Sequence, residues 1–240
     1  MIPNPPIPSS NLPVVKQNTD LALSNANMLM DVANKILSEK STELVDESWM
    51  QRLWDWADGI KLASRHLPRS KERLCKMERL RLPTYGNFFG YDYIPEEIGH
   101  IPNLTSLEID DYYHGYNLAK AIKKMHRLQI LNLKNVSINR DDLLSILTNA
   151  IKIETLSLRF CNIDEIPKEI SKLENLNYLE LWGSTMYPIK LHDSITTLTG
   201  IQNLVIHDPS LLFTEKQIQW IKRIGVKWIR TPQLNIRNSN

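Results

Sequence analysis

One apolar pattern recurs along this chain and constrains its fold more than any other feature. Each copy reads Leu-x-x-Leu-x-Leu, with Ile or Met replacing some leucines, and the copies begin at Met77, Leu104, Leu128, Ile153, Leu176 and Ile201. The steps between these starts are 27, 24, 25, 23 and 25 residues, and slots one, four and six are apolar in all 18 cases. Such a period indicates stacked units that cannot bury their apolar edges alone.

A second apolar set follows the first in each unit. Examples are Ile94-Pro95-x-x-Ile98-x-x-Ile101 and Ile166-Pro167-x-x-Ile170-x-x-Leu173. Over residues 77–230 the two sets together resemble the leucine-rich repeat family. This resemblance implies an α/β fold, a horseshoe-shaped solenoid with a parallel sheet on its concave side and short helices or 3₁₀ turns outside.

The family usually places Asn or Cys at slot nine, where the side chain bonds backbone between coils. Here the slot holds Tyr85, Tyr112, Val136, Cys161, Ser184 and Pro209. We therefore expect Cys161 to be structural rather than a nucleophile. The turns near Tyr85, Tyr112 and Pro209 are expected to depart from the family's geometry.

Both ends of the solenoid carry cap patterns. Apolar residues at helical spacing predict a helix over 18–40, and Trp49, Leu53, Trp56, Ile60 and Leu67 predict a second helix that ends at Pro68. Trp54 lies off that stripe and is expected to pack on the first helix. At the other end, Thr214-x-x-Gln217 is a capping box, Ile218, Ile221 and Ile224 are expected to face inward, and residues 226–230 predict a last edge strand. The predicted organisation is a disordered Pro-rich leader (1–17), a helical cap (18–76), repeats with a C-terminal cap (77–230) and a tail (231–240).

The N-terminal region carries a narrower resemblance. A Trp-rich helix, a short helix with Cys75, the segment ERLRL and a Ser/Pro/Asn-rich start are similar to leucine-rich repeat effectors injected by Gram-negative pathogens. The resemblance implies a virulence effector whose partner is a host protein or another bacterial effector. The best-known members also carry a C-terminal ubiquitin-ligase domain with a catalytic cysteine. The chain is too short for that domain, and its repeats exceed that subgroup's 20 residues, so we do not infer ligase activity.

Composition narrows the function classes. The net charge is +2 without a run of five like charges, so we expect no nucleic-acid partner. No stretch reaches 18 apolar residues, so we expect no membrane insertion. The six histidines show no metal spacing, and no glycine loop of a phosphate-binding type occurs, so we expect no cofactor, no metal and no enzyme activity. Two cysteines and no export signal favour a cytosolic monomer, or one secreted into a host cytosol.

Alternation along each strand sends slots 2, 3, 5, 7 and 8 away from the core, and stacking aligns equal slots in columns. Glu108, Asp110 and Asp111 then form an acidic spot beside a basic spot of Lys134 and Arg159. We expect these charges to select a partner. The alternative is that they neutralise one another, with Asp110 against Lys134.

Aromatic residues form two further groups. Phe160, Tyr178 and Trp182 fall together on the concave face, with Arg159 placed to stack on Trp182, and they predict a protein interface. The alternative is that a loop or the tail covers them. Two aromatic segments, 85–93 with Tyr91 and 110–116 with Tyr113, predict a rim that extends the interface, or else aromatics that pack on one another.

The sequence therefore predicts a protein-binding module that blocks or recruits a partner through its concave face. Two alternatives remain open. One is an adaptor whose helical cap docks a second protein, which exposure of Trp54 would favour. The other is an enzyme with a site assembled across repeats, which a strongly shifted pKa at Glu180 or His207 would favour. Glu180 and His207 also fall on the concave face, and we count them with the predicted partner-binding residues. The concave pair His207-Asp208 belongs to the enzyme alternative as well.

Overall fold

The computed structural model describes residues 25–33, 35, 47–82, 93–110, 117–183, 189–224, 228–231 and 234–237. The chain divides into two units, residues 1–47 and 48–240. In the first unit residues 25–33 are helical, inside the predicted range of 18–40. The predicted leader lies outside the described residues. The division after Glu47 falls within the predicted cap, whose boundary at residue 18 stays a prediction.

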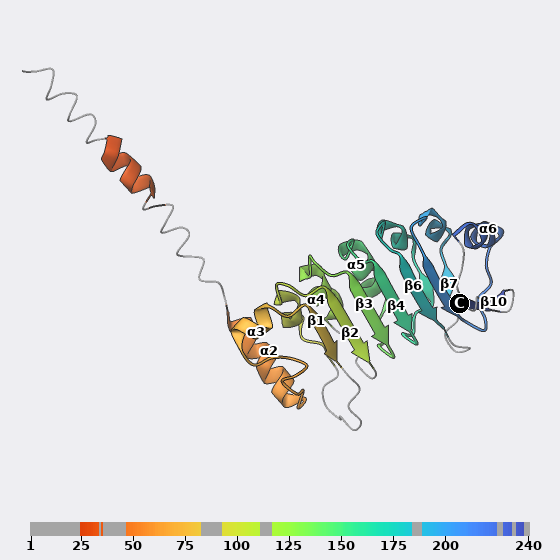
Figure 1. Cartoon of the computed structure of the whole chain (residues 1–240), viewed down its shortest axis with the longest axis horizontal. Helices are drawn as coiled ribbons and strands as arrows, with labels where there is room; N and C mark the ends of the chain where they lie inside the picture. Colours follow the sequence, from red (N-terminus) through yellow and green to blue (C-terminus); the bar gives the residue numbers. More distant parts are fainter. Residues whose placement is uncertain are drawn as a thin grey trace, which may run out of the picture. The chain divides into compact units, whose positions relative to one another are not determined.

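The second unit is built on an eight-stranded sheet (Figure 1). In spatial order the strands are β1 (Arg79–Leu82), β2 (Ser106–Asp110), β3 (Ile130–Lys134), β4 (Thr155–Arg159), β6 (Tyr178–Trp182), β8 (Asn203–His207), β9 (Trp228–Arg230) and β10 (Asn235–Arg237). All neighbours are parallel except β9 and β10. Equal slots pair in register, as Leu107 with Leu131 and Leu156 with Leu179, so the predicted columns are confirmed.

The repeat pattern forms the core. Of its 18 apolar side chains all but Met77 are buried, and Met77 packs partly buried against the same core. The second apolar set lies under the outer layer, where Ile94, Ile98 and Ile101 are at most 3% exposed. These residues make the fold an α/β leucine-rich repeat solenoid, as predicted.

The outer layer consists of short helices, since each repeat has to turn twice and return within the segment between two strands of the sheet. They are η1 (Glu96–His100), α4 (Leu118–Lys124), α5 (Arg140–Asn149), η2 (Lys168–Lys172), η3 (Asp193–Thr197) and α6 (Glu215–Ile224). In Figure 1 they lie along one side of the sheet. Strands β5 (Glu165–Ile166) and β7 (Lys190–Leu191) pair as a small second sheet.

The unit begins with α2 (Ser48–Gly59) and α3 (Lys71–Cys75). Trp49, Leu53 and Trp56 are buried, as the helical spacing predicts. The helix ends at Gly59 rather than at Pro68, because the chain turns at residues 60–61 with a left-handed backbone at the second of them. Trp54 is half-buried and its indole Nε1 donates to the carbonyl of Pro68 at 2.9 Å.

At the C-terminal end the predicted capping box is confirmed, and a different strand forms the edge of the sheet. The amide of Gln217 donates to Thr214 Oγ1 at 3.3 Å, and the amide of Thr214 donates to Gln217 Oε1 at 3.1 Å. Of the three predicted inward isoleucines only Ile221 is fully buried, and Trp220 fills the core beside it. The predicted last edge strand is wrong in one respect, since β10 pairs with β9 and becomes the edge.

Candidate functional site

Nine of the twelve predicted site residues lie on or next to strands β2 to β8, with their side chains off the core side of the sheet. We call this side the concave face. Three others, Tyr91, Asp111 and Tyr113, fall outside the described residues, as do most of the two aromatic segments. The proposed aromatic rim therefore stays a prediction.

The charged residues at the β1 end pair with one another. Lys134 Nζ lies 3.4 Å from Asp110 Oδ1, and Arg81 Nη2 lies 3.4 Å from Asp110 Oδ2. Arg81 Nε is also 3.9 Å from Glu108 Oε2. We call these four residues the charged row. They line a hollow of about 100 Å³ together with Asn132 and Arg159, and the alternative of mutual neutralisation is confirmed for Asp110 and Lys134.

The middle of the face holds a tighter polar group. The Ser157 hydroxyl donates to Glu180 Oε2 at 2.6 Å, and Arg159 Nε lies 3.9 Å from the same oxygen. Burial and then the Glu180 charge raise the pKa of Tyr178 above its usual value. Ser157 is the register partner of Glu180 on the neighbouring strand, although no motif in the sequence marks it.

An aromatic cluster of Phe160, Trp182 and His207 occupies the next three strands. The Phe160 and Trp182 ring centroids lie 5.7 Å apart at 75°, and those of Trp182 and His207 lie 4.8 Å apart at 78°. Edge-to-face contacts of this kind contribute about 0.5–1.5 kcal/mol each. Two of the three predicted aromatics therefore touch, while the third member is His207 rather than Tyr178.

Phe160 stands out by its backbone. Its φ is 54°, in the left-handed region, and its side chain is 41% exposed. The Phe160 amide donates to the Trp182 carbonyl at 3.0 Å, as the Asn135 amide does to the Arg159 carbonyl at 2.8 Å. The equivalent Asn135 has a φ of 52°, so the turn after these two strands uses the same geometry. Asn adopts it readily, whereas a bulky aromatic residue pays a steric cost.

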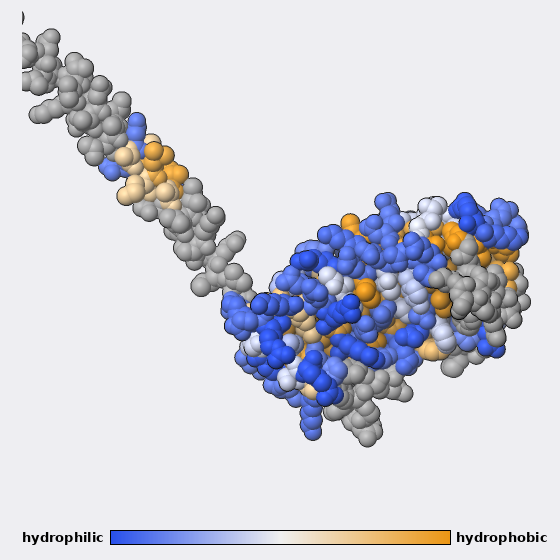
Figure 2. All heavy atoms as spheres, viewed as in Figure 1, coloured by the Kyte–Doolittle hydropathy of each residue, from blue (hydrophilic) through white to orange (hydrophobic). Residues whose placement is uncertain are grey.

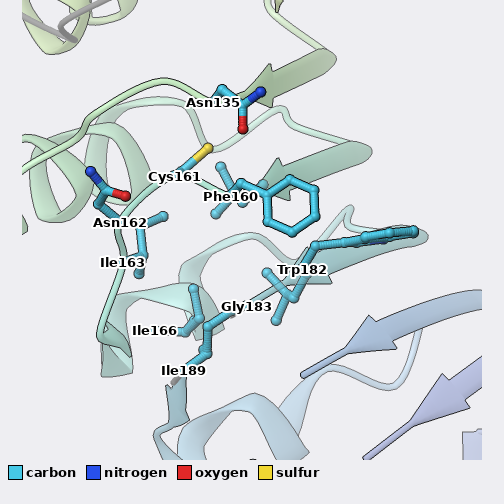
Figure 3. A pocket seen from close by; sticks show the side chains of 11 residues that line it. Asn135, Phe160, Cys161, Asn162, Ile163, Ile166, Trp182, Gly183 and Ile189 are labelled. Atoms are coloured by element: carbon cyan, nitrogen blue, oxygen red, sulfur yellow. The ribbon is translucent and has the colours of Figure 1, made fainter. Parts of the chain in front are cut away.

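A pocket of about 200 Å³ opens beside these rings, between repeats four and five (Figure 3). Its buried wall is apolar, with Leu158, Ile166, Leu181 and Ile189. Cys161 also lines it, is 3% exposed, and lies 3.4 Å from the carbonyls of Leu133 and Arg159. Burial raises the pKa of this thiol to about 12, so it stays protonated and serves as a structural residue.

Asp208 is not displayed on the concave face, contrary to the sequence analysis. It is fully buried, and its carboxylate accepts from the amides of Ile189 at 2.7 Å, Ser210 at 2.8 Å and Leu211 at 3.1 Å. The chain turns inward directly after β8, which rotates slot eight toward the core. A Cβ added at Gly183 would lie 2.2 Å from Asp208 Oδ2, so a glycine is needed there.

Burial, then the charge of Arg230, lowers the pKa of His207, so its imidazole is neutral at pH 7. Within the described residues no three His, Cys, Asp or Glu side chains gather as a metal site would require. Nor does any helix in that part of the chain have the length and apolar character needed to cross a bilayer.

No protein-family model matches the sequence, and no curated protein matches it. Solved structures resemble parts of the fold. A leucine-rich repeat protein of Leptospira interrogans matches with a TM-score of 0.37 and 16% identity over 58% of this chain and 46% of its own. The leucine-rich repeat ectodomain of the receptor kinase SOBIR1 of Arabidopsis thaliana matches with a TM-score of 0.31 and 16% identity over 47% and 71%.

The chain thus aligns with less than half of the Leptospira protein. At these TM-scores neither likeness carries an argument about function. The assignment to a leucine-rich repeat fold rests on the strand register and the repeat core of the molecule itself.

Proposed function

We propose that this chain is a non-enzymatic protein-binding module that holds a partner protein on its concave face. The partner is a host protein or another bacterial effector, which the module blocks or recruits. The aromatic cluster supplies the anchors, and the charged row sets register and partner choice. The observation that carries this proposal is Phe160, an exposed aromatic ring kept on a left-handed backbone.

The physical reason is that Phe160 is unfavourable for the stability of the free protein in two ways. Its backbone costs about 1–3 kcal/mol against an unstrained residue, and its ring exposes apolar surface to water. The fold itself does not need this residue, since Asn135 makes the same turn in the preceding repeat. Strain of this kind is typical of functional positions, and aromatic side chains dominate the energetics of protein interfaces.

The test is affinity capture with mass spectrometry from two lysates, one of a candidate host and one of the source organism. Wild type runs beside Phe160→Asn and Trp182→Ala, each checked for folding by circular dichroism. The matched control is Leu144→Gln, which removes an apolar side chain of similar exposure (37%) from the outer helix α5. We expect a partner that both face variants lose, by about 30-fold or more in affinity, and that the control retains. Retention by all three variants would place the binding site elsewhere.

The adaptor alternative is supported by the first unit rather than by Trp54, which is half-buried and hydrogen-bonded. Helical residues 25–33 expose Met28 and Leu29 at 70% each and Val32 at 51%. Exposed apolar helix faces mark docking segments. A Met28→Asp/Leu29→Asp variant that loses a second captured protein, while keeping the Phe160-dependent one, would establish the adaptor function.

A further inference from the structure

The aromatic cluster lies within a column of cations. Column seven runs in register through Lys134, Arg159, Trp182, His207 and Arg230, one residue on each of five neighbouring strands. Neighbouring strands lie about 4.8 Å apart. Arg159 is thus one strand from Trp182 on one side, and Arg230 is two strands from it on the other.

These cations differ in how far they are neutralised within the chain. Lys134 lies 3.4 Å from Asp110, and Arg159 lies 3.9 Å from Glu180. Arg230 is exposed and forms no ion pair with any residue in the described part of the chain.

Among the described residues the nearby carboxylate of Asp208 forms no ion pair with Arg230. It is fully buried and accepts three backbone amides. The positive charge of Arg230 reaches the aromatic cluster, because together with burial it holds the pKa of His207 below its usual value. Arg230 therefore offers an exposed cation to a partner at the β9 side of the cluster.

The pocket beside the cluster fits one apolar side chain. Its volume is about 200 Å³, its deep wall is aliphatic, and Phe160 and Trp182 lie side by side along it (Figure 3). Asn135 and Asn162 line the same pocket with side-chain amides, which can both donate to and accept from a peptide backbone. An apolar side chain of an extended partner segment would be removed from water when it enters this pocket. The backbone of that segment could at the same time form hydrogen bonds with the two asparagine amides.

We propose that this surface binds an extended segment of a partner protein with an apolar anchor and an acidic residue near it. The apolar side chain enters the pocket, and the carboxylate pairs with Arg230. Two strand spacings, about 9.6 Å, correspond to about three residues of extended chain, so the acidic residue lies about three positions from the anchor. This proposal rests on the proposed function and defines the chemistry of its partner.

The probe that tests it is a library of random 12-residue peptides displayed on phage and selected on the full chain. Selections run in parallel on wild type, Phe160→Asn, Arg230→Glu and Lys222→Glu. Lys222 is an exposed cation of α6, so its variant changes the net charge as Arg230→Glu does. We expect wild type and Lys222→Glu to enrich peptides with an apolar residue and an Asp or Glu two to four positions away.

Arg230→Glu should exchange that acidic preference for Lys or Arg, and the affinity of individual acidic peptides should fall by roughly two- to fivefold, the range of exposed charge pairs. Phe160→Asn should abolish the enrichment. Phe160-dependent peptides without a charge preference, or with one that Arg230→Glu leaves unchanged, would overturn the acidic partner while leaving the proposed function intact. A selection that yields no Phe160-dependent peptides would overturn both.

Discussion

The two ends of the concave face differ in what their outward side chains do. At the β1–β3 end Asp110 lies 3.4 Å from both Arg81 and Lys134, so charge is balanced within the protein. The β4–β8 end carries the aromatic cluster beside its polar group, and one ring of the cluster, Phe160, is exposed on a strained backbone. In Figure 2 the surface over α2 and the first strands is mostly hydrophilic, and apolar patches lie farther along the unit.

This difference teaches where binding energy can come from. An exposed ion pair contributes only about 0–1 kcal/mol, because its two charged groups lose contacts with water when they pair. A partner that replaces such pairs with its own therefore gains little binding energy. Aromatic surface has no such internal partner and releases water when it is covered. The charged end is therefore suited to selecting partners and the aromatic end to holding them.

The largest loss of stability should come from replacing Asp208, in the turn that follows β8 under the aromatic end. Asp208→Ala leaves three amides without their acceptor, two of them in buried hydrogen bonds, and we expect a loss of about 3 kcal/mol in the free energy of unfolding. Urea titration followed by circular dichroism measures it. The Asp208→Asn variant keeps one acceptor oxygen and should lose less. Equal losses in both variants would mean that the charge, rather than the acceptor geometry, matters.

Gly183→Ala should have the next largest effect, about 1–3 kcal/mol, because the new Cβ would lie 2.2 Å from Asp208 Oδ2. The carboxylate cannot move aside without losing its amide donors. The clash is absent when Asp208 is also replaced by Ala. The double variant should therefore lose less free energy of unfolding than the sum of the losses in the two single variants. Simple additivity in urea unfolding would contradict this contact.

Phe160→Asn separates folding from binding at the aromatic end. Relief of the left-handed strain, about 1–2 kcal/mol, offsets the lost contact with Trp182, about 0.5–1.5 kcal/mol. We expect the free energy of unfolding to change by less than about 1 kcal/mol, against about 3–5 kcal/mol for a Phe in a core. A loss of the larger size, measured by urea unfolding, would make Phe160 a structural residue.

At the charged end Asp110→Asn should lower the free energy of unfolding by less than about 1 kcal/mol. The difference from wild type should shrink further in 1 M NaCl, where exposed charges are screened. Glu108→Gln is the control, since its one described ion pair is longer, at 3.9 Å. An Asp110 effect that is large or independent of salt would show that the two ends are less different than we describe.

The smallest expected effect is the contribution of His207 to the pH dependence of stability. The pKa of His207 is lowered in the folded state below its ordinary 6.5, so the unfolded chain binds more protons as the pH falls below 6.5. Stability present above pH 6.5 is therefore lost as the pH falls through the folded-state pKa. His207→Gln should lose less stability than wild type between pH 7.5 and 5.5, measured by thermal unfolding. A parallel loss in the two proteins would remove His207 from this pH response.

The sequence by itself determined the solenoid, its strands and its columns. Spacing of apolar residues sets which side chains are buried, and alternation along a strand sets which face the others occupy, so both follow without the structure. The register Asp110–Lys134 and Arg159–Trp182 was predictable for that reason. The capping box at Thr214 was predictable too, because its bonds form between neighbours in sequence.

Only the tertiary structure decided what happens where the strands end. Slot eight holds Phe160 outward, Gly183 buried and Asp208 turned into the core, although strand alternation treats all three alike. The backbone leaves the extended region after slot seven, and side-chain direction then depends on the local dihedral angles and on contacts between repeats. The inward partners of Asp208 come from that geometry, which no spacing in the sequence encodes.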